Sequence, residues 1–193
     1  NALGLTGSPF DSFLTLRGLR TLDARLRVHQ ENASAIATLL DEHPVVSKVY
    51  FPGLASHPGH AVAARQQKGF GAMLSVELHG GEAAVRAFVD GLEYFTLAES
   101  LGGVESLVAH PATMTHAAMT PEARAKAGIS DSLLRLSVGI ESSEDLVADL
   151  SRWLRPDEDD LGLCQRLVVE AGVVVIPMSA FYAGQAPRGL VRF

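Results

Sequence analysis

Residues able to hold a small amino acid come close together in the middle of this sequence. Glu99 and Ser100 provide an acid and a hydroxyl, and they stand directly before a Leu-Gly-Gly turn. The pair Gly102 and Gly103 permits positive φ angles and lets the backbone approach a ligand closely. Arg135 follows in an otherwise apolar segment, and its planar guanidinium suits bidentate binding of a carboxylate. These residues predict a binding site for an amino acid, but none of them predicts covalent chemistry.

The position of Arg135 in its segment indicates where the side chain points. If residues 133–139 form a strand, Leu134, Leu136 and Val138 share one face, and Arg135 and Ser137 share the other. A buried arginine needs a partner or a wet cleft, because an uncompensated buried charge is costly. Two other interpretations stay open: a surface arginine on an edge strand, or an arginine paired with Glu141. Ser100 likewise has a plainer interpretation as the local cap of an ordinary turn.

The histidines and lysines give weaker signals. His110, Thr113, Thr115 and His116 form a polar cluster after the Gly-Gly turn. Their spacing matches no standard metal-binding motif, so no metal site is expected. A Schiff base with a cofactor would need a lysine, and no lysine here lies in a setting typical of a cofactor site. The lysines are expected to be structural or to face solvent: Lys48, Lys68 and Lys126. His57 and His60 lie in a Pro/Gly turn and are expected to be exposed.

Composition and charge narrow the class of protein. The 193 residues are 47% hydrophobic, which is enough for a packed core. The net charge of −6 argues against nucleic-acid and anionic-membrane partners, since both need a basic face. No apolar run approaches the ~20 residues of a membrane span, and the first residues lack the pattern of a signal peptide. The single cysteine, Cys164, excludes an internal disulfide framework and favours a cytoplasmic location.

Helical and strand-like segments alternate along most of the chain. A long helix is expected over Asp11–Glu42, with Asp11 or Ser12 as its N-cap and Pro44 beyond its end. Periodicity predicts further helices over 59–68, 81–90, 121–127 and 142–154, and strands over 45–51, 71–78, 94–97, 106–109 and 133–138. Interleaving of this kind predicts an α/β two-layer sandwich, in which helices cover a small mixed sheet.

A change in composition divides the sequence near its end. Arg155–Asp160 is polar, acidic and contains proline, which fits either a linker or the N-cap region of another helix. We therefore expect a first domain over residues 1–154 and an appended tail over residues 155–193. The tail has patterns of its own, for a helix over 161–171 and for strands over 173–176 and 189–193.

Four stretches of the chain resemble one enzyme family closely. They are LTGSPFDSFLTLRGLRTLDARLRVHQENA, ARQQKGFGAMLSVEL, FTLAESLGGVESLVAHPATMTHAAM and AGISDSLLRLSVGIE, which together span about residues 1–150. They are similar to the C-terminal part of the cystathionine γ-synthases, in the pyridoxal-phosphate (PLP)-dependent Cys/Met-metabolism family. LAESLGGVES and THAAM are typical of the whole γ-synthase and γ-lyase branch, whereas KGFGAML and LLRLSVGIE are closer to the synthases.

The resemblance implies a fold, a site and a reaction. The fold would be the small domain of a fold-type-I PLP enzyme, and the assembly would be a homo-oligomer. Arg135 would grip the α-carboxylate of the substrate, Glu99 and Ser100 would line the site, and Thr115 would lie nearby. The implied reaction is γ-replacement, in which cysteine displaces the γ-substituent of an O-acylhomoserine to give cystathionine. This is a step of transsulfuration and methionine biosynthesis.

The same resemblance implies that the chain is inactive by itself. In the family, four parts that handle PLP all lie before the position matching Asn1. They are the anchoring lysine, the ring-stacking aromatic residue, the aspartate at the pyridinium nitrogen and the phosphate-binding loop. PLP chemistry needs the lysine Schiff base and the acidic partner. We therefore expect the isolated chain neither to anchor PLP nor to turn over substrate.

The tail resembles a different group of enzymes. LCQRLVVEAGVVVIPMSAFY and GLVRF are similar to the C-terminal end of class I/II aminotransferases, over about residues 157–193. Arg192 matches the arginine of their terminal strand that grips a substrate carboxylate, so it is a possible second carboxylate site. Two alternatives to a transsulfuration enzyme part stay open: a non-catalytic folded fragment or assembly module, and an aminotransferase-type fragment.

Overall fold

The computed structural model describes residues 6–154 together with the short segments 176–177 and 191–192. The chain divides into two compact units, Asn1–Trp153 and Leu154–Phe193. The described elements of the second unit are two antiparallel strands, β6 (Ile176–Pro177) and β7 (Val191–Arg192). The assignment of residues 1–154 and 155–193 to separate domains stays a prediction.

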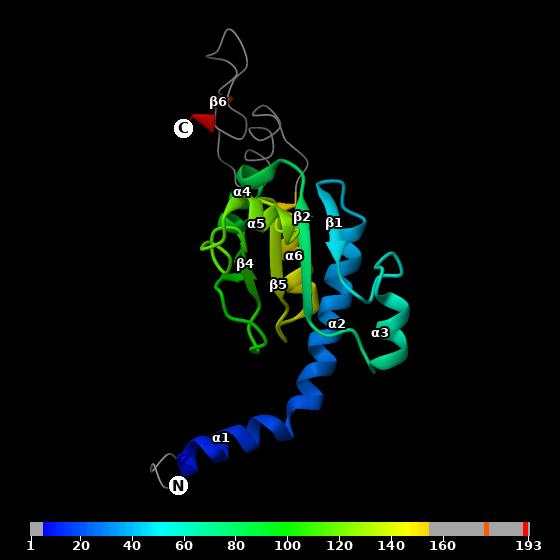
Figure 1. Cartoon of the computed structure of the whole chain (residues 1–193), viewed down its shortest axis with the longest axis vertical. Coiled ribbons are helices and arrows are strands. Elements are labelled where there is room, and N and C mark those ends of the chain that lie inside the picture. The colour runs from blue at the N-terminus through cyan, green and yellow to red at the C-terminus, as the bar shows by residue number, and fades with distance from the viewer. Residues whose placement is uncertain (1–5, 155–175, 178–190, 193) are drawn as a thin grey trace. The chain divides into compact units, whose positions relative to one another are not determined.

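A five-stranded mixed sheet forms the centre of the first unit (Figure 1). Its strands are β1 (Val46–Tyr50), β2 (Met73–Leu78), β3 (Thr96–Leu97), β4 (Leu107–Ala109) and β5 (Leu133–Ser137). They lie in the order β1-β2-β5-β4-β3, in which β3 and β4 are parallel and the other pairs antiparallel. β5 is therefore a middle strand, hydrogen-bonded to β2 on one side and to β4 on the other.

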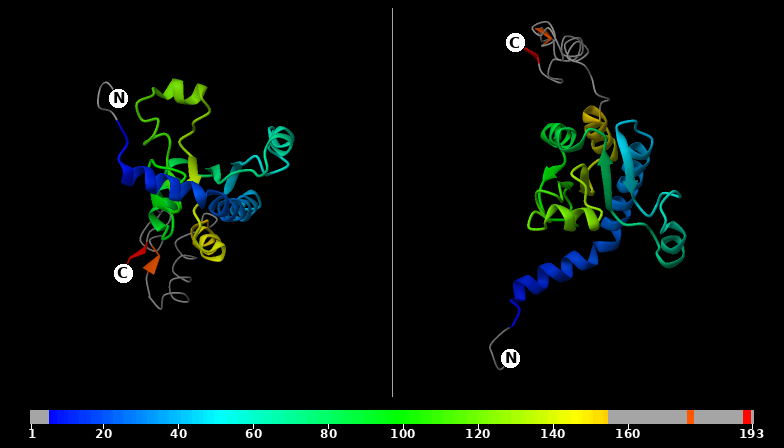
Figure 2. Two further views of the ribbon diagram at one scale, coloured as in Figure 1. Left: turned by 90° about the horizontal axis from the view of Figure 1, so that it is seen from below. Right: turned by 45° about the horizontal axis from the view of Figure 1, so that its top comes forward.

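Three helices pack on one face of this sheet and on one another: α2 (Leu22–Asp41), α4 (Gly81–Gly91) and α6 (Ser143–Trp153). Figure 2 shows α2 and α6 side by side on the same side of the strands. Because strand side chains alternate, every second residue of β2 and β5 enters this core. Leu74 lies opposite Leu136, and Val76 opposite Leu134, all buried. The predicted α/β two-layer fold, a small mixed sheet covered by helices, is confirmed.

The prediction of one helix over Asp11–Glu42 is wrong. The chain forms α1 (Pro9–Arg20) and then α2, with a break at Thr21, where φ is −104° and ψ is 1°. Two side chains stabilise the break: Thr21 Oγ1 and Arg25 Nη2 donate to the carbonyl of Gly18, at 3.2 and 2.7 Å. Helical periodicity continues almost unchanged across a one-residue break, so the spacing of apolar residues over 11–42 did not reveal the break.

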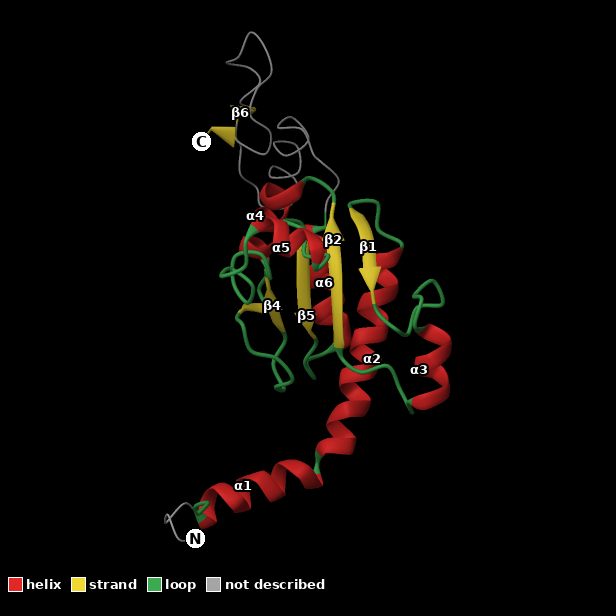
Figure 3. Ribbon diagram, in the orientation of Figure 1, coloured by secondary structure: helices red, strands yellow, loops and turns green. Residues whose placement is uncertain are grey.

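The predicted N-cap is also wrong, because α1 begins earlier than expected. Ser8 is the N-cap, and its Oγ accepts the Asp11 N–H at 3.4 Å, with a proline directly following in the first turn. α1 contains no buried residue, and Figure 3 shows it running away from the sheet. Its large apolar side chains are all exposed: Phe10, Phe13, Leu14, Leu16 and Leu19.

The second face of the sheet carries the alternate strand residues. Arg135 lies there, opposite Ser75 of β2 and Ala109 of β4. Arg135 and Ser75 are half-buried, whereas Ala109 is buried. We call this side the open face, because α2, α4 and α6 pack on the other one. Alternation in β5 therefore gives Leu134 and Leu136 to the core and Arg135 to the open face, as the sequence pattern indicated.

The remaining helices are α3 (His60–Gln66) and α5 (Pro121–Lys126). Within the described part of the chain, no helix is long and apolar enough to cross a membrane.

In the second unit, the predicted helix over 161–171 lies outside the described residues. The strand expected to stop before Pro177 instead includes it, since β6 is Ile176–Pro177 and pairs with β7 alone. Proline is tolerated on such an edge strand, where its missing N–H faces away from the ladder.

Candidate functional site

Arg135 reaches from the open face to the loop that follows β3. Its Nη2 donates to the carbonyl oxygens of Glu99, at 2.8 Å, and of Ser100, at 3.2 Å. Its Nε is buried without a hydrogen-bond partner, and no other buried side-chain nitrogen or oxygen of the described residues lacks one. The structure thus brings Arg135 to Glu99 and Ser100, and the contact is to their backbone rather than to their side chains.

The two simpler interpretations of Arg135 are wrong. β5 is a middle strand, so Arg135 does not lie on an edge. The Glu141 carboxylate binds Ser106 instead: Oε1 accepts the Ser106 N–H at 2.7 Å, and Oε2 accepts the Ser106 hydroxyl at 2.9 Å. Ser106 Oγ in turn accepts the Gly139 N–H at 2.8 Å. This network joins the residue before β4 to the chain that leaves β5.

The Gly-Gly turn is held by the residue two places beyond Arg135 on the same face. The Gly102 N–H donates to Ser137 Oγ at 2.9 Å, and Ser137 is buried. Gly102 has φ +75°, a conformation that glycine adopts without strain. Two residues after Gly102, the Val104 carbonyl accepts the Ile140 N–H at 2.9 Å. The end of β5 therefore fixes the far half of the loop that Arg135 contacts.

Thr115 is not joined to this group. Its Oγ1 lies 2.8 Å from Nδ1 of His116, and its side chain is exposed. Among the described residues, no hydrogen bond connects Thr115 with Arg135, Glu99 or Ser100. A role for Thr115 in the site stays a prediction.

His110 is buried and fully hydrogen-bonded. Nδ1 lies 2.8 Å from Thr113 Oγ1, and Nε2 lies 3.1 Å from the carbonyl of Asp131. Since a carbonyl only accepts, Nε2 must carry a proton. His110 lines a groove of about 230 Å³ between α4 and the turn after β4, together with Val85, Val89, Leu97 and Met114 among others. No group of three or more His, Cys, Asp or Glu side chains in the described ranges is placed to hold a metal ion.

The expectation that His57 and His60 are exposed is wrong. Both are half-buried. The ring of His60 stacks on Phe70, with 5.4 Å between ring centroids, and its Nδ1 lies 2.8 Å from the carbonyl of Pro52. These contacts fasten the start of α3 and are structural. The aromatic partner follows α3 in the sequence, and no local pattern signalled the stacking.

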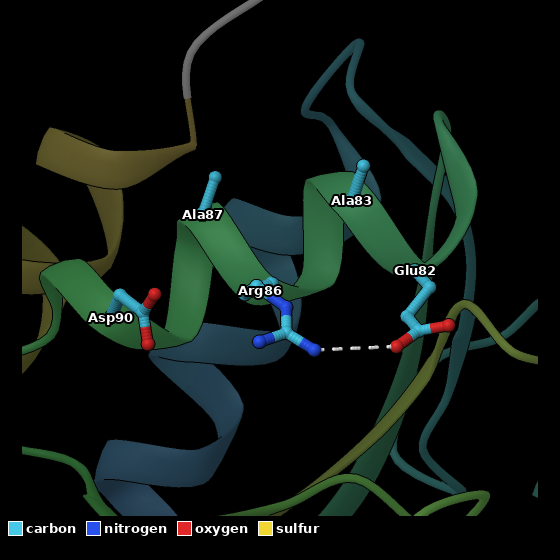
Figure 4. A pocket seen from close by; sticks show the side chains of 5 residues that line it. All are labelled: Glu82, Ala83, Arg86, Ala87 and Asp90. Carbon is cyan, nitrogen blue, oxygen red and sulfur yellow. Dashed lines mark ion pairs between the residues drawn. The ribbon is translucent and has the colours of Figure 1, made fainter.

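A shallow hollow on α4 contains none of the residues predicted to bind an amino acid. Figure 4 shows its lining, which consists of Glu82, Ala83, Arg86, Ala87 and Asp90. Its one drawn ion pair joins Arg86 to Glu82 at 3.5 Å, and both side chains are largely exposed. Such surface pairs contribute about 0–1 kcal/mol. Neither this hollow nor the His110 groove includes Arg135, so the candidate site is the open face beside the 99–102 loop.

Tyr50 gives the open face a titratable group whose behaviour can be tested. Its hydroxyl donates to Glu77 Oε1 at 3.0 Å. Burial raises the pKa of Tyr50 above its ordinary value, the contact with Glu77 raises it further, and Lys48 lowers it in part. We expect a spectroscopic pH titration to show Tyr50 ionising later than an ordinary tyrosine, and Tyr50→Phe to remove that step.

The same shift links Tyr50 to stability at high pH. A raised folded-state pKa means that the phenol's contribution is present below the unfolded value of about 10 and is lost as pH rises through the folded value. Glu77→Gln is expected to move the titration back toward the ordinary value. A Tyr50 step unchanged by that substitution would contradict the hydrogen bond.

Sequence reasoning missed the residues that hold the loops. Asp149 of α6 is buried, and its carboxylate accepts the N–H groups of Glu93 and Tyr94, at 3.1 and 2.9 Å. This fixes the turn between α4 and β3. Ser106 and Glu141 act in the same way at the end of the loop between β3 and β4. The partners are 35 to 56 residues apart, so no local pattern could have found them.

Comparison with known proteins gives one family. The model of the family described as Cys/Met metabolism PLP-dependent enzyme matches residues 1–155. Among curated relatives, cystathionine γ-synthase of Escherichia coli (strain K12) is 61% identical over 155 residues, which are 80% of this chain and 40% of the relative. Cystathionine γ-lyase of Dictyostelium discoideum is 53% identical over 154 residues, with the same shares.

Solved structures agree with this. A cystathionine γ-synthase from Xanthomonas oryzae pv. oryzae, in complex with aminoacrylate and cysteine, has 83% identity and a TM-score of 0.75. A cystathionine γ-lyase from Lactobacillus plantarum, complexed with L-serine, has 46% identity and a TM-score of 0.71. Each match covers 79% of this chain and 40% of the solved chain. The chain thus spans about 40% of the length of the relatives that it matches.

Proposed function

The chain belongs to the Cys/Met metabolism family of PLP-dependent enzymes, and from this premise we propose that it supplies the substrate-carboxylate part of an active site. The observation that carries the proposal is the state of Arg135. Its Nε is buried and unpartnered, although guanidinium N–H groups are good donors. A carboxylate that accepted from Nε and Nη2 would form two charge-assisted bonds, one of which would satisfy Nε.

The proposed roles of the other residues follow from their contacts. Glu99 and Ser100 orient the guanidinium through their carbonyl oxygens, and Ser137 holds the loop in place through Gly102. A carboxylate bound beside Arg135 would leave the rest of the amino acid at the loop surface. Thr115 is proposed as a further site residue from the family likeness alone.

The family's cofactor, PLP, supplies the electron sink for reactions at amino-acid carbons when it is bound through a lysine. The residues of this chain do not fit that attachment. Its three lysines are all exposed, and none lines either hollow described above: Lys48, Lys68 and Lys126. We therefore propose that the chain alone does not turn over substrate. The γ-replacement of an O-acylhomoserine by cysteine, giving cystathionine, would need a lysine-bearing partner segment and a homo-oligomer of such enzymes.

Binding of an amino-acid carboxylate by the full 193-residue chain tests the proposal. Two charge-assisted hydrogen bonds of about 1.5–3 kcal/mol each give dissociation constants from roughly tens of micromolar to several millimolar. We expect L-serine to cause a saturable shift of the Arg135 Nε–H resonance in ¹⁵N–¹H spectra. Arg135→Lys should remove the binding, because a lysine offers no planar fork.

Two controls make the result specific. L-serinamide has the same amine and hydroxyl but no carboxylate, so it should leave the Arg135 resonance in place. Arg86→Lys, an equivalent change on the exposed face of α4, should bind L-serine as before. Equal shifts with L-serine and L-serinamide would contradict carboxylate recognition at Arg135.

A second function is proposed for the tail from its likeness to aminotransferases. Arg192 belongs to β7, opposite Ile176 of β6, and its side chain lies outside the described residues. If the tail acts as an aminotransferase part, transamination should be lost in Arg192→Ala and kept in Arg135→Ala. A purely non-catalytic module, the remaining alternative, would show neither activity nor L-serine binding.

A further inference from the structure

The loop beside Arg135 is held at both ends by hydrogen bonds from backbone N–H groups, whereas its middle is held by the guanidinium of Arg135. At the start, the Ala98 N–H donates to the Val108 carbonyl at 2.9 Å. At the far end, the Gly102 N–H donates to Ser137 Oγ at 2.9 Å. Between these points lie residues 99–101, here called the strap. All three strap residues are exposed, so no buried side chain anchors them, and Arg135 Nη2 holds the strap by two carbonyl oxygens.

The geometry of a guanidinium makes these two bonds incompatible with full carboxylate binding. A bidentate carboxylate accepts either from Nε and Nη2 or from Nη1 and Nη2, so both arrangements use an Nη2 proton. Nη2 carries two protons and already makes two hydrogen bonds to the strap, to the carbonyls of Glu99 and Ser100. A carboxylate can therefore take two bonds from Arg135 only after a strap carbonyl has released Nη2.

We infer that the strap competes with the substrate carboxylate for Arg135, so that carboxylate binding releases the middle of the strap while Ser137 retains its far end. This inference rests on the proposed function of Arg135. The Ser100 bond, at 3.2 Å, is longer than the Glu99 bond, at 2.8 Å, and is the one expected to yield. The arriving carboxylate then satisfies Nε, which lacks a partner while the strap is fastened.

Ser137 is the positioning residue in this device. It lies on the same face as Arg135, and its hydroxyl accepts from the N–H of Gly102, the residue directly after the strap. Gly102 has a positive φ and open space where a side chain would be, so the chain can turn there without a collision. Release is therefore confined to residues 99–101 and does not spread to the network of Ser106 and Glu141.

Carbonyl ¹³C shifts of Glu99 and Ser100 in the full chain test the inference, because they report hydrogen bonding at those oxygens. Without ligand, Arg135→Lys should shift both carbonyls upfield, and Arg124→Lys should not. Arg124 is a matched control, since it is half-buried and donates to another loop carbonyl, that of Met119. Ser137→Ala should speed amide exchange of Gly102 about tenfold, the loss of one hydrogen bond, with the Arg135 Nε–H signal still present.

With L-serine as the probe, the Ser100 carbonyl should shift upfield in step with the Arg135 Nε–H signal, and Gly102 exchange should stay unchanged. A shift at Nε–H with both strap carbonyls unmoved would overturn the competition and leave the proposed function standing. No response to L-serine anywhere would overturn the proposed function and the release step together. Unmoved carbonyls in Arg135→Lys would show that the strap is not held by Arg135 at all.

Discussion

Replacing Leu136 with alanine is expected to lower the free energy of unfolding by about 3–4 kcal/mol, within the range for Leu→Ala in a packed core. Leu136 is fully buried on the middle strand β5, opposite Leu74 of β2 and Val108 of β4. Strands on both sides limit how far the structure can collapse into the cavity. Urea unfolding followed by the fluorescence of Trp153, the single tryptophan, measures this loss in the first unit.

The matched control is Leu133→Ala in the same strand. Leu133 is half-buried on the open face, opposite Glu77, so its truncation should cost less than about 1.5 kcal/mol, since less apolar surface returns to water. Equal losses from the two substitutions would contradict the assignment of core and open faces. The comparison uses one residue type and one strand, so strand propensity cancels.

Replacing Gly139 with alanine should cost about 3 kcal/mol, at the upper end for adding one methyl group to a filled site. A Cβ there would lie 2.4 Å from the Val104 carbonyl oxygen and 2.6 Å from the Glu105 carbonyl carbon. Both are backbone atoms, which cannot swing aside as a side chain does. We expect the loop to be pushed off β5, with weaker binding of Gly139 N–H to Ser106 Oγ.

Gly18→Ala serves as the control for this substitution. In α1 the nearest atom to an added Cβ would be Arg25 Nη2 at 3.9 Å, and alanine favours a helix over glycine by about 1 kcal/mol. It should therefore leave stability unchanged or raise it slightly. Thermal or urea unfolding of the two variants gives the comparison, and a Gly139→Ala protein as stable as the parent would show that the loop yields freely.

Alternation along strands carried most of what the sequence could predict. The pattern of β5 was enough to separate Leu134 and Leu136 from Arg135, because side chains of neighbouring strand residues point to opposite faces. Interleaved helices and strands likewise gave the two-layer fold, which the structure confirms. These signals are local, since each depends on the spacing of residues within a few positions. The roles of Glu99, Ser100, Thr115 and Arg135 in binding stay predictions.

The features that could not be predicted depend on partners far apart in the chain. Glu141 was weighed as a partner of Arg135 because it is close in sequence, yet folding places Ser106 beside its carboxylate. The break at Thr21 follows from Arg25 reaching back to Gly18, a choice between competing hydrogen bonds that periodicity does not register. The contact of Arg135 with backbone oxygens is of the same kind, since carbonyls are present at every residue and leave no mark in the sequence.

The two faces of β5 also have a consequence for which amino-acid substitutions the protein can accept. Substitutions at its inward positions are expected to alter folding, whereas the outward positions Leu133 and Arg135 lie at the proposed carboxylate site. Because the two sets do not pack against each other, their effects should be nearly additive. At the proposed site, we therefore expect substitutions at alternate positions of a single strand to change ligand preference while the scaffold stays intact.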